Sequence, residues 1–195
     1  MKFIIGSVCA LFLVACSPAV SGTPEGAKLA HTEAAPSVVS RIDTSSGSIA
    51  GLRAGMTKDQ LIATGLAINE RSLMLEGDEY VVLDVSLHEG LVVECWLDEG
   101  RIRELRTAAE GMKDEKGVGV GSSLAALRSA YPSGRLVTGE EDGRRYANFV
   151  NRSKVVFEMD IEVLPKACFD NQSAGCDARQ DVRVRSVVVY SGPST

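Results

Sequence analysis

The sequence predicts an α+β fold built from two tandem repeats, each a short helix followed by an antiparallel β-meander, with both helices packed on one face of a shared sheet. Two observations predict it. A glycine-flanked helix start occurs twice at a constant spacing of 66 residues, since Gly51–Leu61 aligns with Gly117–Leu127. After each start, apolar and polar residues alternate in several segments, as in strands with one buried face. We therefore expect repeat units over residues 38–110 and 111–195 that form one folded body.

The first repeat opens with a helix. Thr57 and Gln60 have the spacing of a capping box, and Gly65 suits the end of the helix. Turns over 88–90 and 98–100 then separate strands, the last of which covers 101–107. The apolar face of the first two strands is expected to consist of Val81, Leu83, Val85, Leu87, Leu91, Val93, Cys95 and Leu97.

The second repeat follows the same plan. Ser122 or Ser123 caps a helix that ends before Pro132. Strands are expected over 146–150, 155–163 and 182–190, with a turn over 151–153. About 15 extra residues precede the last strand, and this insertion contains Cys168 and Cys176.

The N-terminus predicts the location of the protein. Residues 1–15 have the short apolar run of a signal peptide, too short to span a bilayer. Residues 13–16, Leu-Val-Ala-Cys, resemble the bacterial lipobox, in which the cysteine becomes the acylated first mature residue. Because Ser17 follows rather than Asp, the resemblance implies an outer-membrane lipoprotein on the periplasmic face, anchored by palmitate-type chains on Cys16. Residues 16–37 read as a lipidated flexible linker. The alternative is a soluble secreted protein.

The composition excludes several classes of function. A net charge of −5 leaves no basic footprint for nucleic acid, and two histidines with scattered cysteines do not predict a metal centre. No nucleophile–base pair emerges, so we expect no enzyme activity, no cofactor and no small-molecule substrate. Gly117–Ser123 lacks the Lys-Ser/Thr ending of a phosphate loop, and tight turns explain its glycines.

The cysteines predict one structural disulfide. Cys168 and Cys176 flank a turn-rich loop and are expected to form a disulfide in an oxidising compartment, rather than a redox pair. Cys95 is expected to be a buried thiol, although pairing with either neighbour is possible.

Two groups of strand residues are candidates for surface roles. Tyr80, Val82, Val92 and Trp96 share the strand face opposite the apolar one, which predicts an outward patch suited to a protein partner. Alternatively, a loop or the linker covers it. Glu158, Asp160 and Glu162 are expected to form a solvent-side charge ladder with Arg183 and Arg185.

Resemblances to known families extend this interpretation. Gly55–Leu61 (Gly-Met-Thr-Lys-Asp-Gln-Leu) resembles the opening of small outer-membrane assembly lipoproteins of the BamE type. The tandem arrangement is similar to the β-lactamase inhibitor protein fold, which duplicates that unit. Residues 101–131 resemble a family of enterobacterial envelope lipoproteins regulated by envelope stress.

The resemblances imply a non-enzymatic, periplasm-facing lipoprotein that binds a protein partner in envelope assembly or maintenance. The alternative is a periplasmic inhibitor of a lysozyme-like or other envelope hydrolase. The mature chain would carry 20 basic and 26 acidic side chains, a net charge of −6 that suits a cationic enzyme. The loop over 168–176 would then be the inserting element.

Overall fold

The computed structural model describes residues 41–170 and 179–192, which belong to one compact unit. The expected signal peptide (1–15), the whole expected linker (16–37) with Cys16, and Cys176 lie outside the described residues. Within the described part of the chain, no helix is long and apolar enough to cross a membrane.

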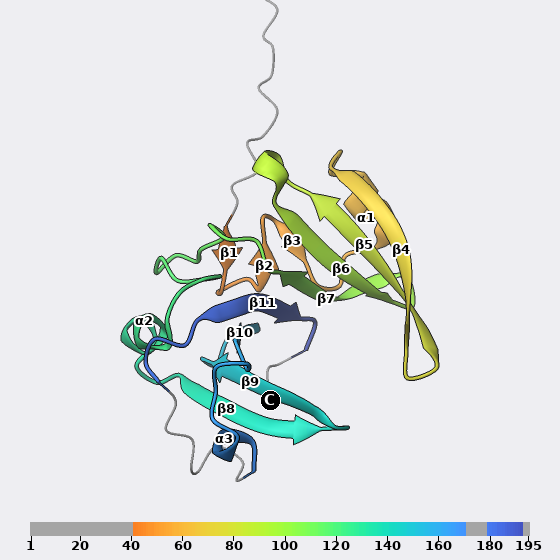
Figure 1. Cartoon of the computed structure of the whole chain (residues 1–195). Helices are drawn as coiled ribbons and strands as arrows, with labels where there is room; N and C mark the ends of the chain where they lie inside the picture. The colour runs from red at the N-terminus through yellow and green to blue at the C-terminus, as the bar shows by residue number, and fades with distance from the viewer. Residues whose placement is uncertain (1–40, 171–178, 193–195) are drawn as a thin grey trace, which may run out of the picture. The chain divides into compact units, whose positions relative to one another are not determined.

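Eight antiparallel strands form the main sheet, in the order β4-β5-β6-β7-β11-β10-β9-β8 (Figure 1). Its first half contains β4 (Ala67–Leu75), β5 (Asp78–Ser86), β6 (Val92–Asp98) and β7 (Arg101–Thr107). The second half contains β8 (Arg135–Glu141), β9 (Arg144–Val150), β10 (Val155–Met159) and β11 (Val184–Tyr190). β7 and β11 pair in the middle, so four consecutive strands lie on each side of that junction. The expected class, antiparallel strands with a few short helices, is confirmed.

Short helices and a small second sheet complete the fold. The helices are α1 (Lys58–Ile62), α2 (Leu124–Ala130), α3 (Ala167–Asp170) and a 3₁₀ turn, η1 (His88–Gly90). A three-stranded sheet contains β1 (Ile42–Asp43), β2 (Ser48–Ile49) and β3 (Leu52–Arg53). The capping box of α1 is confirmed, because the Thr57 hydroxyl accepts from the Gln60 amide at 3.2 Å while Gln60 Oε1 accepts from the Thr57 amide at 2.9 Å. Ser123 caps α2.

One hydrophobic core joins the two halves. The apolar face of the main sheet and both longer helices contribute side chains to the same buried cluster. Leu61 of α1 and Leu127 of α2 are fully buried there, together with Leu83, Cys95 and Phe157 of the sheet. At about 25 cal/mol per Å² of buried apolar surface, this burial is the main favourable contribution to folding.

The two halves make the same local contacts around their helix starts. The Gly55 amide donates to the Ile102 carbonyl at 2.6 Å, and the Gly121 amide donates to the Val184 carbonyl at 2.9 Å. Each of those glycine carbonyls in turn accepts from an arginine at the start of the last strand of its half. Arg101, the first residue of β7, donates at 3.1 Å, and Arg183, directly before β11, donates at 2.9 Å. Both helix starts are therefore tied to the sheet in one way.

The outer hairpins of the two halves also correspond. Arg71 pairs with Val82 in β4–β5, and Val137 pairs with Asn148 in β8–β9, each 66 residues later. Both turns consist of two residues with positive φ, Glu76-Gly77 (56° and 95°) and Asp142-Gly143 (50° and 73°), the backbone that a two-residue hairpin requires. The same spacing therefore persists from the helix start through the hairpin.

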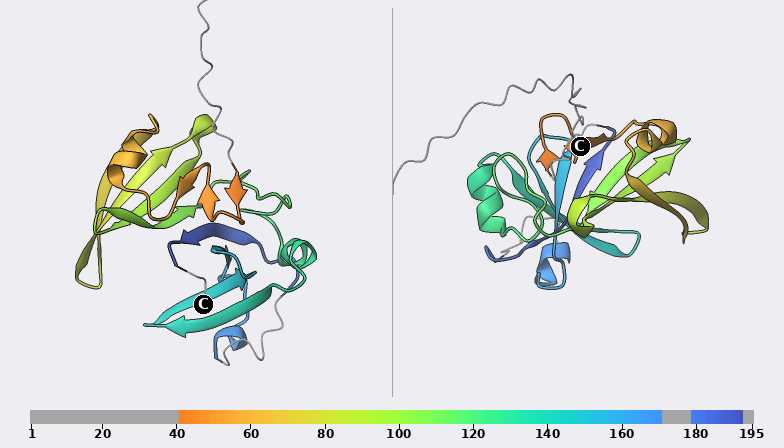
Figure 2. Two further views of the ribbon diagram at one scale, coloured as in Figure 1. Left: turned by 180° about the vertical axis from the view of Figure 1, so that it is seen from behind. Right: turned by 90° about the horizontal axis from the view of Figure 1, so that it is seen from above.

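Several elements differ from the sequence-based expectation. The edge strands β4 and β8, the strands β1–β3 and helix α3 were not predicted. α1 ends at Ile62, ahead of Gly65. β10 ends at Met159 rather than at residue 163, because Asp160 turns the chain by accepting from the Glu162 amide at 3.1 Å. α3, within the predicted insertion, packs on β8 (Figure 2).

Candidate functional site

The candidate site lies on the sheet face opposite the core, which we call the second face. Because side chains alternate along a strand, the residues between the core positions point to this side. It carries Arg71 of β4, Tyr80, Val82 and Asp84 of β5, Val92, Glu94 and Trp96 of β6, Glu104 and Arg106 of β7, Glu158 of β10, and Ser186, Val188 and Tyr190 of β11.

Three residues of the predicted patch reach the surface of this face. Tyr80 and Trp96 are half-buried, with ring centroids 6.1 Å apart. The Arg103 guanidinium lies 5.7 Å from the centroid of the Tyr80 ring, and Val92 is 39% exposed. The aromatic pair is thus held in place by neighbours while part of each ring stays accessible.

The fourth residue, Val82, was predicted to look outward and this prediction is wrong in part. Val82 is on the expected face but is fully buried. Its cross-strand partners on that face are Arg71 and Trp96, whose larger side chains flank it on both sides. Val82 therefore supports the patch from below and is not a contact residue.

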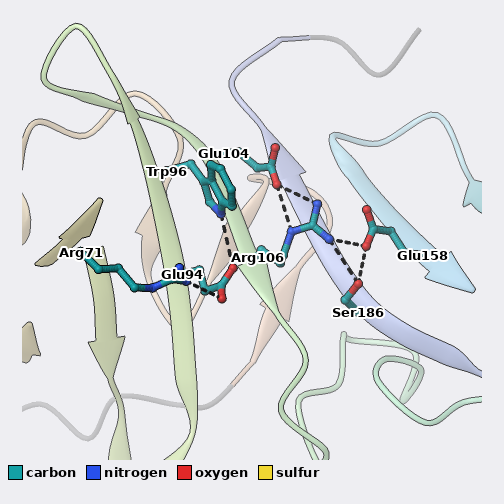
Figure 3. A network of polar contacts seen from close by, with 7 residues as sticks. All are labelled: Arg71, Glu94, Trp96, Glu104, Arg106, Glu158 and Ser186. Atoms are coloured by element: carbon teal, nitrogen blue, oxygen red, sulfur yellow. Dashed lines mark hydrogen bonds and ion pairs between the residues drawn. The ribbon is translucent and has the colours of Figure 1, made fainter. Parts of the chain in front are cut away.

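A network of ion pairs crosses the second face beside Trp96 (Figure 3). Arg71 donates to Asp84 at 2.9 Å and to Glu94 at 2.8 Å. Glu94 also accepts from the indole nitrogen of Trp96 at 3.3 Å, which joins the aromatic pair to the charges. The two carboxylates hold the pKa of Arg71 above its usual value, so its charge is fixed.

Arg106 is the centre of the second part of the network. Its guanidinium donates to Glu104 at 3.0 and 3.2 Å, to Glu158, and to the Ser186 hydroxyl at 3.5 Å. Ser186 also donates to Glu158. This network joins the two halves of the sheet, because Glu104 and Arg106 lie on β7 while Ser186 and Glu158 lie on β11 and β10 (Figure 3).

Burial makes this cluster sensitive to its charge balance. Desolvation raises the pKa of Glu104, and the shared guanidinium of Arg106 offsets only part of that effect. Burial and the nearby Glu104 and Glu158 also raise the pKa of Tyr190 to about 12. In the whole network four carboxylates share two guanidinium groups. One carboxylate oxygen, Asp84 Oδ1, is buried and has no hydrogen-bond partner within the described residues.

Two hollows adjoin Arg106. One of about 310 Å³ is lined by Val92, Glu94, Thr107 and Arg106 among others. A second, of about 470 Å³, includes Arg106, Glu158, Tyr146 and Tyr190. Glu76 and Arg144 come from the two outer hairpins to line this second hollow, and their side chains are 3.3 Å apart. The second face therefore has a hollow on each side of Arg106.

The cysteine predictions have separate outcomes. Cys95 is buried and free, as expected, and burial raises the pKa of its thiol to about 12, so it is unreactive at neutral pH. Cys168 is buried and disulfide-bonded. Because Cys176 lies outside the described residues, the pairing of Cys168 with Cys176 stays a prediction.

The expected charge ladder is wrong. β10 and β11 are neighbours, but Glu158 faces Ser186 and binds Arg106 instead of Arg183 or Arg185. The reason is a bulge that shifts the register after Glu158, with Arg185 as the extra residue. Asp160 lies beyond the end of the strand. The described residues contain no cluster of His, Cys, Asp and Glu able to hold a metal ion.

Comparisons with known proteins bear on the fold alone. The chain matches no protein-family model. No curated protein matches its sequence. Among solved structures it is similar to the crystal structure of YfeY, an uncharacterised protein from Escherichia coli, with a TM-score of 0.51 and 12% identity. That similarity covers 77% of this chain and 97% of YfeY, so the two share a fold over most of their length.

Proposed function

We propose that this chain is a non-enzymatic lipoprotein, anchored through acylated Cys16 to the periplasmic face of the outer membrane, that binds a protein partner through the second face in envelope assembly or maintenance. The observation that carries the proposal is the partly exposed pair Tyr80 and Trp96 beside a network of charges. Aromatic side chains next to fixed polar groups are typical of the energetic centre of protein interfaces.

The polar groups of the second face support a specific contact. Arg71 and Arg106 are held by their carboxylate partners before a partner arrives, so little ordering is needed on binding. The hollows on both sides of Arg106 would take up side chains of that partner.

The proposal includes an origin by duplication. We infer that the halves of the sheet are two copies of one unit, each with its helix on the core side. The matching helix-start contacts of Gly55 and Gly121, the hairpin spacing of 66 residues and the two equivalent turns support it. The resemblance to BamE-type lipoproteins and to the β-lactamase inhibitor protein fold is proposed on the same grounds.

The experiment is a crosslinking pull-down of the acylated full chain from its own envelope. A Tyr80→Ala, Trp96→Ala double variant should lose the partner, because truncating central aromatic residues costs about 2 kcal/mol or more, roughly 30-fold in affinity. Val163→Ala is the matched control, since Val163 is exposed but lies outside the second face. Equal capture by wild type and the double variant would contradict the proposal.

One observation favours a second candidate, inhibition of a cationic envelope hydrolase such as a lysozyme. The network on the second face has four carboxylates for two guanidinium groups, an acidic balance that attracts a basic surface. An inhibition assay with lysozyme distinguishes the two candidates. Loss of lysozyme activity at stoichiometric chain would favour the inhibitor, and unchanged activity would favour the assembly or maintenance role.

A further inference from the structure

The two edges of the main sheet are not equivalent. At one edge, α3 packs against β8, and the Thr138 hydroxyl donates to the Cys168 carbonyl, so Thr138 is only 1% exposed. At the other edge, β4 pairs along all nine residues with β5 and with no other described strand. Ser72, which occupies in β4 the place that Thr138 has in β8, is exposed. Figures 1 and 2 show no described strand beside the free edge of β4.

An unpaired edge specifies the chemistry of what binds it. Alternate residues of β4 direct their backbone N–H and C=O groups away from β5, and another extended strand satisfies those groups best. Two of the four large apolar side chains exposed in the described residues, Ile62 and Met74, belong to α1 and β4. We propose that a second copy of this chain pairs antiparallel with β4 about a two-fold axis at Ser72.

The sequence of β4 selects this axis. A two-fold axis perpendicular to the sheet must pass through a residue of β4. If it passed between two residues, side chains that point to opposite faces of the sheet would lie across from each other. An axis at Arg71 sets two arginines opposite each other, and an axis at Glu70 does the same with two glutamates, both of which are repulsive. An axis at Ser72 instead places Arg71 opposite Leu73 and Glu70 opposite Met74.

Among the axes that set no two like charges opposite each other, the axis at Ser72 gives the longest pairing. With the axis at Ser72, the seven residues from Asn69 to Leu75 pair. Axes at Asn69 or Leu73 leave only five residues of β4 in register. Seven pairs form roughly six to eight backbone hydrogen bonds, since every second pair contributes two.

The covered edge limits the assembly to two copies. With α3 against β8, only β4 is available, so the contact is the same surface on both copies and closes on itself. The dimer would place the second faces of the two copies on the same side of one continuous sheet. This inference rests on the sheet edges and stands without the proposed function.

Cysteine crosslinking of the full chain tests the register. Ser72→Cys should give a disulfide-linked species of twice the chain mass on oxidation, several-fold above the background of the native cysteines. Met74→Cys alone should not, because two-fold-related Met74 positions would lie about 13 Å apart, four residues at about 3.3 Å each, too far for a disulfide. When Met74→Cys chains are mixed with Glu70→Cys chains, the two should form a disulfide, because these positions lie opposite each other about the axis at Ser72. Equal coupling by all single variants, or none above background, would overturn the proposal.

Sedimentation of the detergent-solubilised full chain gives an independent readout. Ser72→Arg would set two charges opposite each other at the axis and should shift a dimeric wild type to monomer. Ser86→Arg is the matched control, because Ser86 is an exposed serine on β5 and should leave the dimer intact. A monomeric wild type, or a Ser72→Arg variant that stays dimeric, contradicts pairing at this edge.

Discussion

Replacing Arg106 by Met should lower the free energy of unfolding by about 2–3 kcal/mol at neutral pH. Arg106 is 28% exposed and is the guanidinium shared by Glu104 and Glu158, whose side chains are 11% and 16% exposed. Removing one partner of a buried ion pair costs about 3–5 kcal/mol, because the other charge is left uncompensated, and partial exposure reduces that figure. Met keeps an apolar stem opposite the buried Val188, so little of the loss comes from packing.

Urea unfolding of the wild type and the variant at two pH values measures this effect. At low pH, where the buried Glu104 with its raised pKa is protonated, the loss caused by Arg106→Met should shrink. Arg103→Met is the matched control, because Arg103 is exposed and its guanidinium lies over the Tyr80 ring, and it should cost less than about 1 kcal/mol. A loss no larger than that of Arg103→Met, or one that does not change with pH, would refute the reasoning.

Three further predictions concern the same unit. Burial raises the pKa of Glu104 in the folded state. The stability that protonation of Glu104 gives is therefore present below its ordinary pKa of 4.5 and is lost as the pH rises through the raised value. Glu104→Gln should remove that part of the pH dependence of the free energy of unfolding, measured by urea titration. Thr57→Ala and Ser123→Ala should each lower the free energy of unfolding, measured by thermal unfolding, by about 1 kcal/mol, since each removes a helix N-cap. Clearly unequal losses in the two variants would argue against equivalent helix starts. Cys168→Ser should cost about 2–3 kcal/mol, and the wild type should lose the same amount in reductant, if the short loop closes as predicted.

The sequence predicted the inner strands of the fold better than its edges. Alternating apolar residues indicated β5 and β6 because one face of those strands packs on the core, with Leu83 and Cys95 among the buried residues. β4 lacks that alternation, since all nine of its residues are exposed or half-buried and Glu70 and Arg71 interrupt the pattern. β1 to β3 are only two residues long, too short for any periodic signal.

The candidate site was predicted in part for a similar reason. The period of two placed Tyr80 and Trp96 on the correct face, but it carries no information on what flanks a residue, so the burial of Val82 was missed. The pairing of Arg106 with Glu158 depends on β7 and β11 being neighbours, a contact between segments 80 residues apart. The bulge at Arg185 then decides which carboxylate reaches which arginine, and nothing in the sequence pattern indicated it.

The central claim is that the second face contacts a protein partner. Its most direct test is site-specific photocrosslinking in intact cells, with the photoreactive side chain placed at Val92, which is exposed on the second face, or at Val163, which is exposed elsewhere. The account predicts a specific protein adduct from position 92, lost when Trp96 and Tyr80 are replaced by Ala, and none from position 163. Adducts from position 163 alone, or adducts from position 92 that survive loss of both aromatic residues, would contradict it.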